Sequence, residues 1–238
     1  MKTVAIIPAG GSGKRMQSSL SKQYLLLKGI PILVHTLKVF QNSSMVHDIF
    51  LVVPPGDIEF VKQSIVHEYG ISKVSRVLPG GQERQDSVKN GLDAVGDDCD
   101  IVIIHDGVRP FISEELVHLA ILEASREGAV TTGIPVKDTV KTVDQKGWIM
   151  ETLSRDRLWL TQTPQAFKRE VIKRAYMLAG HDHYYGTDDA ILVERAGIHV
   201  KMLSGSYDNI KVTTKEDLLL AEVFMKKKKD LHENRFWI

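Results

Sequence analysis

The chain has 238 residues and a formal net charge of +1, with 43% hydrophobic and 26% charged residues. This length suits one α/β domain with a sizeable core, and the balanced charge gives no indication of a nucleic-acid or membrane-surface partner. The single cysteine, Cys99, excludes an internal disulfide and a cysteine-built metal site. No apolar stretch approaches the length of a membrane span, and the N-terminal apolar run is too short for a signal peptide. We therefore expect a cytoplasmic protein.

Apolar runs and helical periodicity alternate along the chain. Short apolar runs bounded by turn residues predict strands over residues 4–7, 48–53, 74–78, 100–105, 129–135 and 200–203. Apolar positions at helical spacing and helix-start signals predict helices over residues 32–41, 58–69, 87–95, 113–127, 166–178, 188–196 and 214–227. This alternation predicts an α/β fold with a doubly wound, mostly parallel, Rossmann-like sheet covered on both faces. Ligands bind such sheets at the carboxyl ends of the strands.

The segment 137–160 breaks this alternation. Polar and apolar side chains alternate over 137–143, a glycine-containing turn follows at 144–147, and the chain returns over 148–153, which predicts a β-hairpin. A small domain offers this hairpin little room to bury its apolar side. We therefore expect a single domain over residues 1–238 with a protruding arm that pairs with a second copy, and a simple edge hairpin is the alternative.

The loop after the first predicted strand is rich in glycine and basic residues. It contains Ala9, Gly10, Gly11, Ser12, Gly13, Lys14, Arg15 and Lys22. Glycines let the backbone approach a ligand closely and turn several N–H groups toward an anion. The Gly-Lys-[Ser/Thr] of a P-loop is absent, and Met16 stands where a dinucleotide fingerprint has its third glycine. This composition favours a polyphosphate ligand, and a tight connection without a ligand is the alternative.

The loop after the third predicted strand again pairs two glycines. It contains Gly80, Gly81, Gln82, Arg84 and Ser87. The glycines allow close approach to a flat base. Arg84 and Ser87 can both reach a phosphate or a ribose, although Ser87 can equally cap the helix that follows.

The loop after the fourth predicted strand carries an aspartate followed by glycine, Asp106-Gly107. At the end of a buried strand Asp106 is a candidate ligand for Mg²⁺ or ribose, and an ion pair with Arg109 is the alternative. We assign the neighbouring His105 a structural role. Farther along, Asp188 and Asp189 are explained most simply as acids at a helix start.

The last candidate segment, 207–213, contains Asp208 and Lys211. Lys211 lies among apolar neighbours near a strand end, which predicts a charged partner. Asp208 either joins Asp106 at a metal ion or hydrogen-bonds within its own loop.

A set of motifs runs in order from Val4 to about Val223. They are Pro-Ala-Gly-Gly-x-Gly-x-Arg-Met, Lys22-Gln23, Gly-Gly-x-x-Arg-x-x-Ser, His-Asp-x-x-Arg-Pro, Pro-Val-Lys-Asp-Thr-x-Lys, Arg155, Gln162-Thr163-Pro164-Gln165 and Asp208-Asn209-Ile210-Lys211. This set resembles the 2-C-methyl-D-erythritol 4-phosphate cytidylyltransferases, the CTP-dependent enzymes of the non-mevalonate isoprenoid pathway. Ribitol-5-phosphate cytidylyltransferases share the first loop and Thr-Pro-Gln, but the Pro135–Thr139 segment and Arg155 favour the methylerythritol family. Two positions depart from the family pattern, Ser21 in place of proline and Gln82 where an acid is common.

The resemblance implies a mechanism and roles for individual residues. A phosphate oxygen of the substrate attacks the α-phosphorus of CTP in line and pyrophosphate leaves, so positioning and charge neutralisation carry the chemistry. Catalytic roles are implied for Arg15, Lys22, Arg155 and Lys211. Nucleotide contacts are implied for Ala9, Gly10, Gly11, Ser12, Gly13, Gly80, Gly81, Gln82, Arg84, Ser87, Asp106 and Gly107. Substrate contacts are implied for Asp106, Arg109, Thr139, Arg155 and Lys211.

The same resemblance implies partners and a cofactor. The partners are CTP, a polyol phosphate and a second subunit, whose Thr139 and Arg155 would grip the substrate phosphate, with Arg157 as the rival of Arg155. The cofactor is Mg²⁺ or another divalent cation at Asp106, with Asp208 as a further candidate ligand. Two alternatives remain. One is a sister nucleotidyltransferase acting on ribitol phosphate or a hexose phosphate. The other is a non-catalytic nucleotide-binding domain, which the basic residues in three separate loops disfavour.

Overall fold

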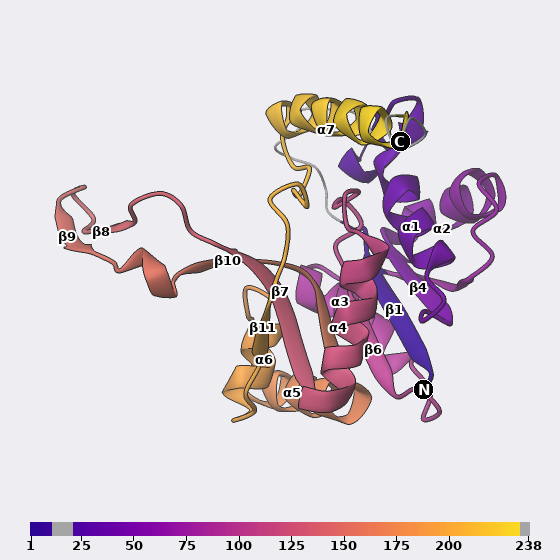
Figure 1. The fold of residues 1–238 in the computed structure, drawn as a ribbon. Coiled ribbons are helices and arrows are strands. Elements are labelled where there is room, and N and C mark those ends of the chain that lie inside the picture. Colours follow the sequence, from indigo (N-terminus) through magenta and orange to yellow (C-terminus); the bar gives the residue numbers. More distant parts are fainter. Residues whose placement is uncertain (11–20, 234–238) are drawn as a thin grey trace.

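A computed structural model describes residues 1–10 and 21–233 of the chain, with side chains up to residue 227 (Figure 1). The predictions for Gly11, Ser12, Gly13 and Arg15 lie outside the described residues. The central element is a seven-stranded sheet with the strand order β11-β7-β10-β6-β1-β4-β5. The strands are β1 (Thr3–Pro8), β4 (Asp48–Val53), β5 (Val74–Pro79), β6 (Ile101–Ile104), β7 (Ala129–Pro135), β10 (Trp159–Lys168) and β11 (Lys201–Ser204).

Helices cover both faces of this sheet (Figure 1). They are α1 (Ile32–Asn42), α2 (Ile58–Val61), α3 (Arg84–Asp93), α4 (Glu114–Glu127), α5 (Arg169–His181) and α6 (Ala190–Arg195). The last helix, α7 (Lys215–Glu233), lies beyond the end of the sheet, where its Ala221 packs in a third apolar cluster with Leu27 and Phe111 (Figure 1). A short antiparallel pair, β2 (Leu26–Leu27) and β3 (Ile30–Pro31), precedes α1. The helix predicted over 58–69 begins as α2 and continues as a π-helix, Lys62–His67.

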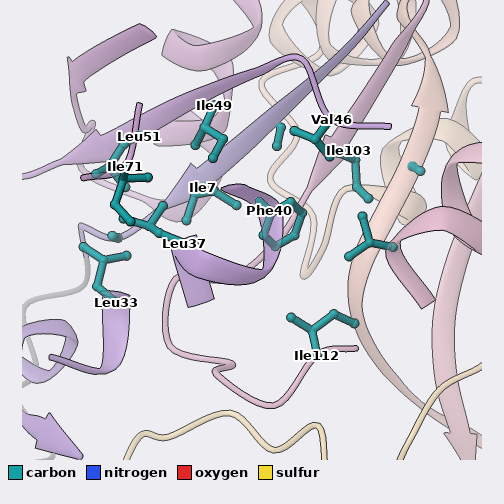
Figure 2. Close-up of a cluster of buried hydrophobic side chains, with 14 of the residues drawn as sticks. Ile7, Leu33, Leu37, Phe40, Val46, Ile49, Leu51, Ile71, Ile103 and Ile112 are labelled. Carbon is teal, nitrogen blue, oxygen red and sulfur yellow. The ribbon is translucent and has the colours of Figure 1, made fainter. Parts of the chain in front are cut away.

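Side chains of β1 divide between two apolar clusters because successive residues of a strand point to opposite faces. Ala5 and Ile7 pack with α1, α2 and α4, where Leu37 and Phe40 are fully buried (Figure 2). Val4 and Ile6 pack on the other face with α3, α5 and α6. The strand is therefore apolar at every one of these positions, as expected for a central parallel strand.

One strand differs from the sequence prediction. Residues 166–168 were expected to begin a helix, but they end β10, and α5 begins only at Arg169. β10 runs antiparallel between β6 and β7, and its Ala166 and Phe167 pair with Ile103 and Val102. Pairing with neighbours distant in sequence overrides the local helical pattern here.

Helix boundaries follow their caps. The predicted cap of α4 is confirmed, because Ser113 Oγ accepts a hydrogen bond from the amide of Leu116 at 3.2 Å. α3 begins at Arg84, earlier than predicted, because Glu83 and Asp86 form a reciprocal capping box. Ser87 is therefore not a cap. At the C-terminal end α7 runs to Glu233, beyond the predicted end at 227.

The predicted hairpin is present as β8 (Lys141–Val143) and β9 (Ile149–Thr152), paired antiparallel. It extends away from the central sheet (Figure 1). Its large apolar side chains are exposed, Trp148 by 71% and Met150 by 69%. Within residues 1–10 and 21–233, no helix is long and apolar enough to cross a membrane.

Candidate active site

A cavity of about 400 Å³ lies at the carboxyl ends of β1, β5 and β6, where the sequence predicted a ligand site. Its lining brings together residues from five separate stretches of the chain. These are Pro8, Ala9, Gly10, Lys22, Gln23, Gly81, Gln82, Glu83, Arg84, Ser87, Asp106, Val108 and Lys211. The predicted residues Gly80 and Gly107 are not part of this lining, but each is the sequence neighbour of a lining residue, Gly81 and Asp106.

The loop after β5 is held by its own hydrogen bonds. Ser87 Oγ accepts from the amide of Gly81 at 3.1 Å and donates to the carbonyl of Glu83 at 3.2 Å. A Cβ atom at position 81 would collide with Asp86, so glycine is required there. Ser87 therefore fixes the backbone that the sequence analysis expected to approach a base.

Arg84 bridges two carboxylates. Its Nε lies 3.1 Å from Asp106 Oδ1, and its Nη2 lies 2.8 Å from Asp189 Oδ2. Burial opposes the charge on Arg84, but the carboxylates of Asp189 and Asp106 outweigh burial and raise its pKa. The interpretation of Asp189 as a dipole-favoured acid at a helix start was incomplete. Asp189 is 1% exposed and also accepts a hydrogen bond from the Tyr176 hydroxyl at 2.6 Å.

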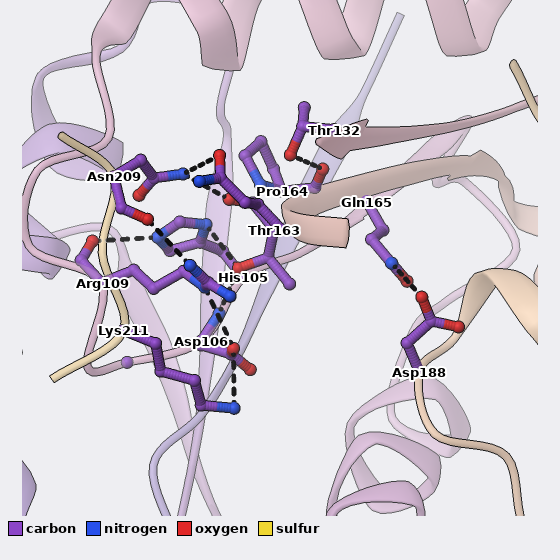
Figure 3. A network of polar contacts seen from close by, with 12 residues as sticks. His105, Asp106, Arg109, Thr132, Thr163, Pro164, Gln165, Asp188, Asn209 and Lys211 are labelled. Atoms are coloured by element: carbon purple, nitrogen blue, oxygen red, sulfur yellow. Dashed lines mark hydrogen bonds and ion pairs between the residues drawn. The ribbon is translucent and has the colours of Figure 1, made fainter. Parts of the chain in front are cut away.

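Asp106 carries the densest set of ion pairs in the described part of the chain. Besides Arg84, the Nζ of Lys211 lies 3.0 Å from its Oδ2, and the Nε of Arg109 lies 3.3 Å from the same oxygen (Figure 3). Burial alone would raise the pKa of Asp106, but the three cations hold it well below its usual range. With Asp189, which pairs with Arg84, these five side chains sum to a charge of +1, which suits an anionic ligand.

A second cavity of about 250 Å³ shares Arg84, Asp106 and Lys211 with the first. Its other lining residues are Arg109, Thr161, Gln162, Thr163, Gln165, Thr187 and Asp188. The charged cluster around Asp106 thus borders two cavities. Thr163 and Gln165 come from β10, and the quoted Gln-Thr-Pro-Gln motif was their signal in the sequence, although no individual role was predicted for them.

His105 has the structural role that the sequence analysis assigned to it. It is fully buried, with Nε2 3.1 Å from the carbonyl oxygen of Arg109 and Nδ1 3.1 Å from Thr163 Oγ1 (Figure 3). Burial lowers its pKa to about 4, so the ring is neutral near pH 7.

Other predicted site residues lie outside these two cavities. Asp208 lines a different cavity with Phe111 and Phe224, 3.6 Å from the Nζ of Lys227, so the structure does not place it beside Asp106. Thr139 and Arg155 lie on the segments that join the hairpin to the sheet, where Arg155 Nη1 donates to the carbonyl of Lys137 at 2.9 Å. Among the described residues, no group of three or more His, Cys, Asp or Glu side chains could hold a metal ion.

The mostly parallel α/β sheet, with a cavity lined by Lys22, Arg84 and Lys211 at its strand ends, is typical of a nucleotidyltransferase. Comparison with known proteins shows which family of nucleotidyltransferases the chain belongs to. The family model described as 2-C-methyl-D-erythritol 4-phosphate cytidylyltransferase matches residues 3–227, and the chain belongs to this family. A protein of that name from Syntrophus aciditrophicus is 54% identical over 226 residues, covering 95% of this chain and 97% of that protein.

Solved structures agree with this assignment. The 4-diphosphocytidyl-2C-methyl-D-erythritol synthase of Anaerococcus prevotii superposes with a TM-score of 0.84 at 34% identity, covering 94% of this chain and 96% of that one. The 2-C-methyl-D-erythritol 4-phosphate cytidylyltransferase of Thermus thermophilus gives a TM-score of 0.76 at 28% identity, covering 95% and 100%.

Proposed function

We propose that this chain transfers a cytidylyl group from CTP to 2-C-methyl-D-erythritol 4-phosphate, giving 4-diphosphocytidyl-2-C-methyl-D-erythritol and pyrophosphate. The observation that carries the proposal is the cationic cluster of Arg84, Arg109 and Lys211 around Asp106, which borders both cavities. Two phosphorylated ligands can meet at such a cluster. The names of the relatives favour methylerythritol phosphate over ribitol phosphate as the acceptor.

The reaction requires positioning and neutralisation of charge. A phosphate oxygen of the acceptor forms a bond to the α-phosphorus of CTP, while the bond from that phosphorus to the bridging oxygen breaks and pyrophosphate leaves. We assign the triphosphate to Ala9, Gly10, Lys22 and the neighbouring loop with Arg15. We assign binding of the cytosine base and the ribose to Gly80, Gly81, Gln82, Ser87 and Asp106. Lys211 and Arg109, which face the second cavity, then hold the acceptor phosphate.

A divalent cation fits this site, but Asp106 is the carboxylate that the protein would offer it, and few further protein ligands are at hand among the described residues. Mg²⁺ usually takes one or two carboxylates and completes its shell with phosphate oxygens and water. Asp106 is the carboxylate that would hold it, but three cations already contact that side chain. The ion would therefore take most of its ligands from the triphosphate, and when bound it supplies further charge neutralisation at the phosphates.

We also propose that the chain is one nucleotidyltransferase domain that forms a homodimer through the arm at about 137–160. The exposed apolar side chains of the arm support this, because such a surface is costly to leave in water. In the dimer Thr139 and Arg155 would reach the partner's second cavity and grip the substrate phosphate there, with Arg157 as the rival of Arg155. A cytoplasmic location stays an expectation from the sequence.

The decisive experiment measures pyrophosphate release from CTP and Mg²⁺ with each polyol phosphate in turn. We expect release with methylerythritol phosphate and little with ribitol 5-phosphate. Release with ribitol 5-phosphate but not with methylerythritol phosphate would indicate a ribitol-5-phosphate cytidylyltransferase instead. CTP binding without release from any acceptor would favour a non-catalytic nucleotide-binding domain.

A further inference from the structure

The arm is tied to the rest of its own subunit at residues 135–137, the root of the arm, where the chain leaves β7. Tyr207, in the loop between β11 and α7, donates a hydrogen bond from its hydroxyl to the carbonyl oxygen of Pro135 at 2.7 Å. The ammonium group of Lys137 lies over the same ring, with Nζ 3.5 Å from the ring centroid. Figure 1 shows this loop rising beside the root of the arm. Tyr207 therefore holds both ends of the root.

The root of the arm in turn holds Arg155, on the returning side of the arm. The amide of Val136 donates to the carbonyl oxygen of Leu158 at 2.9 Å, so the outgoing and returning segments are paired here. Beside this pairing, Nη1 of Arg155 donates to the carbonyl oxygen of Lys137 at 2.9 Å. One hydrogen bond fixes one edge of the guanidinium and leaves its other N–H groups for a ligand. A line of contacts thus runs from Tyr207 through Lys137 to Arg155.

This line of contacts distinguishes the two arginines that compete for the substrate phosphate. Arg155 and Arg157 share one short 3-10 turn, Arg155–Arg157. Of the two, it is Arg155 whose guanidinium binds the carbonyl oxygen of Lys137. A change at the root of the arm should therefore be felt at Arg155 first.

The loop that carries Tyr207 is itself bound to the sheet. The amide of Gly205 donates to the carbonyl oxygen of Gly133 in β7 at 2.7 Å. Farther along, the same loop carries Lys211, whose Nζ lies 3.0 Å from Asp106 Oδ2. Tyr207 therefore sets the root of the arm relative to the sheet and the charged cluster. A side chain held on such a base can keep a functional group in its productive place.

We propose that Tyr207 is a positioning residue for Arg155: by holding the root of the arm, it fixes where the Arg155 guanidinium meets the acceptor phosphate. The inference rests on the proposed function, which assigns Arg155 to that phosphate. Tyr207 lines neither of the two cavities and acts only through the root of the arm. Without its contacts the root must be ordered when the acceptor binds, and that ordering costs affinity.

The test compares Tyr207→Phe and Tyr207→Leu with wild type in pyrophosphate release. The phenylalanine variant loses the hydrogen bond to Pro135 but keeps a ring beneath Lys137, and the leucine variant loses both contacts. We expect kcat/KM for methylerythritol phosphate to fall about threefold in the first and about tenfold in the second. The KM for CTP should stay unchanged, because Tyr207 lies outside the cavity assigned to the nucleotide. Equal losses for both substrates, or no loss in the leucine variant, would overturn the inference.

Two variants of Lys137 test the contact with the ring. Lys137→Arg keeps a cation that stacks well on an aromatic face, so it should react as wild type does. Lys137→Gln removes the cation and should lower kcat/KM for the acceptor about threefold. Equal values for the two variants would contradict a role for the Tyr207 ring in holding the root of the arm.

Double mutants decide whether Tyr207 acts through Arg155. In an Arg155→Ala background the guanidinium is already gone, so Tyr207→Leu should cause no further loss of kcat/KM. In an Arg157→Ala background the same change should still cost about tenfold. A merely structural role would give the same loss in both backgrounds and would overturn the inference. So would a loss that disappears only in the Arg157→Ala background.

Tyr69→Leu is the matched control. Nζ of Lys38 lies 5.8 Å from the centroid of the Tyr69 ring, and neither residue lines either cavity. This variant should keep the wild-type constants for both substrates, and urea denaturation shows that each variant is folded. Failure of the proposed function looks different, because wild-type protein would then release no pyrophosphate with methylerythritol phosphate.

Discussion

Arg84 and Asp189 form an ion pair that ties the first residue of α3 to the residue before α6, 105 positions away in the chain. Their Nη2–Oδ2 distance is 2.8 Å, and Asp189 is 1% exposed. The second carboxylate oxygen of Asp189 accepts from Tyr176 at 2.6 Å. Asp189 and Tyr176 line neither cavity, yet together with Asp106 they hold in place the Arg84 side chain, which lines both.

Asp189→Asn should destabilise the protein and weaken nucleotide binding. Removing one member of a buried ion pair typically costs about 3–5 kcal/mol, because the partner keeps its charge without compensation. We expect a loss near the lower end, since Arg84 keeps Asp106. Urea denaturation measures the loss, and the KM for CTP should rise. Tyr176→Phe is the matched control, which removes one hydrogen bond to the same carboxylate and should cost about 1 kcal/mol. Equal unfolding free energies for Asp189→Asn and wild type would contradict this interpretation of the pair.

His105 should make the stability of the ligand-free protein depend on pH in the acid range. Burial lowers its pKa from the usual 6.5 to about 4. As pH falls through this window the unfolded chain takes up a proton first, so folding loses up to about 1.4 kcal/mol per pH unit. The loss begins below about pH 6.5 and is complete near pH 4. His105→Gln lacks this contribution. Between about pH 7 and pH 4, the unfolding free energy of wild type should fall by about 3 kcal/mol more than that of the variant. Parallel curves for the two proteins would rule this out.

Lys211→Ala and Lys22→Ala should lose activity without losing the fold. Removing a charged contact made mainly in the transition state typically lowers kcat by roughly 10²–10³. Asp106 keeps Arg84 and Arg109 when Lys211 is removed, so its charge stays compensated and the unfolding free energy should change by less than about 1 kcal/mol. The same loss of kcat is expected for Arg15→Ala. Lys62→Ala, at an exposed lysine paired with Glu59, is the control and should turn over normally. Normal turnover in a site variant would remove that residue from the mechanism.

Local patterns predicted much of the fold. The strands over 48–53 and 129–135 have the predicted bounds, and Ser113 caps α4 as expected. Both features depend on residues that are close together in the sequence, so a local pattern is enough to predict them. The missed strand, β10, depends on partners in β6 and β7, which no local pattern encodes. Its apparent helical signal belongs to the α5 residues that follow it.

In the site, too, local patterns predicted individual residues but not the contacts that form between distant parts of the chain. Glycine loops and charged residues at strand ends marked Gly81, Arg84, Asp106 and Lys211, and the structure brings all four to one cavity. The Arg84–Asp189 pair could not be predicted, because it joins residues that are adjacent only after the sheet has formed. The roles proposed for Thr139 and Arg155 depend on a second copy of the chain and stay predictions.

Those roles can be tested by mixing two inactive variants. If Arg155 acts in the partner's site, Arg155→Ala and Lys211→Ala place their defects in different subunits of a mixed dimer. One site of that dimer then carries both defects and the other carries none. With random exchange half of the dimers are mixed, so activity should return to about a quarter of the wild-type value. Pyrophosphate release after mixing and dilution measures the recovery, and Arg157→Ala with Lys211→Ala tests the rival arginine. If Arg155 instead serves its own subunit, every site in the mixture has one defect, and no activity returns.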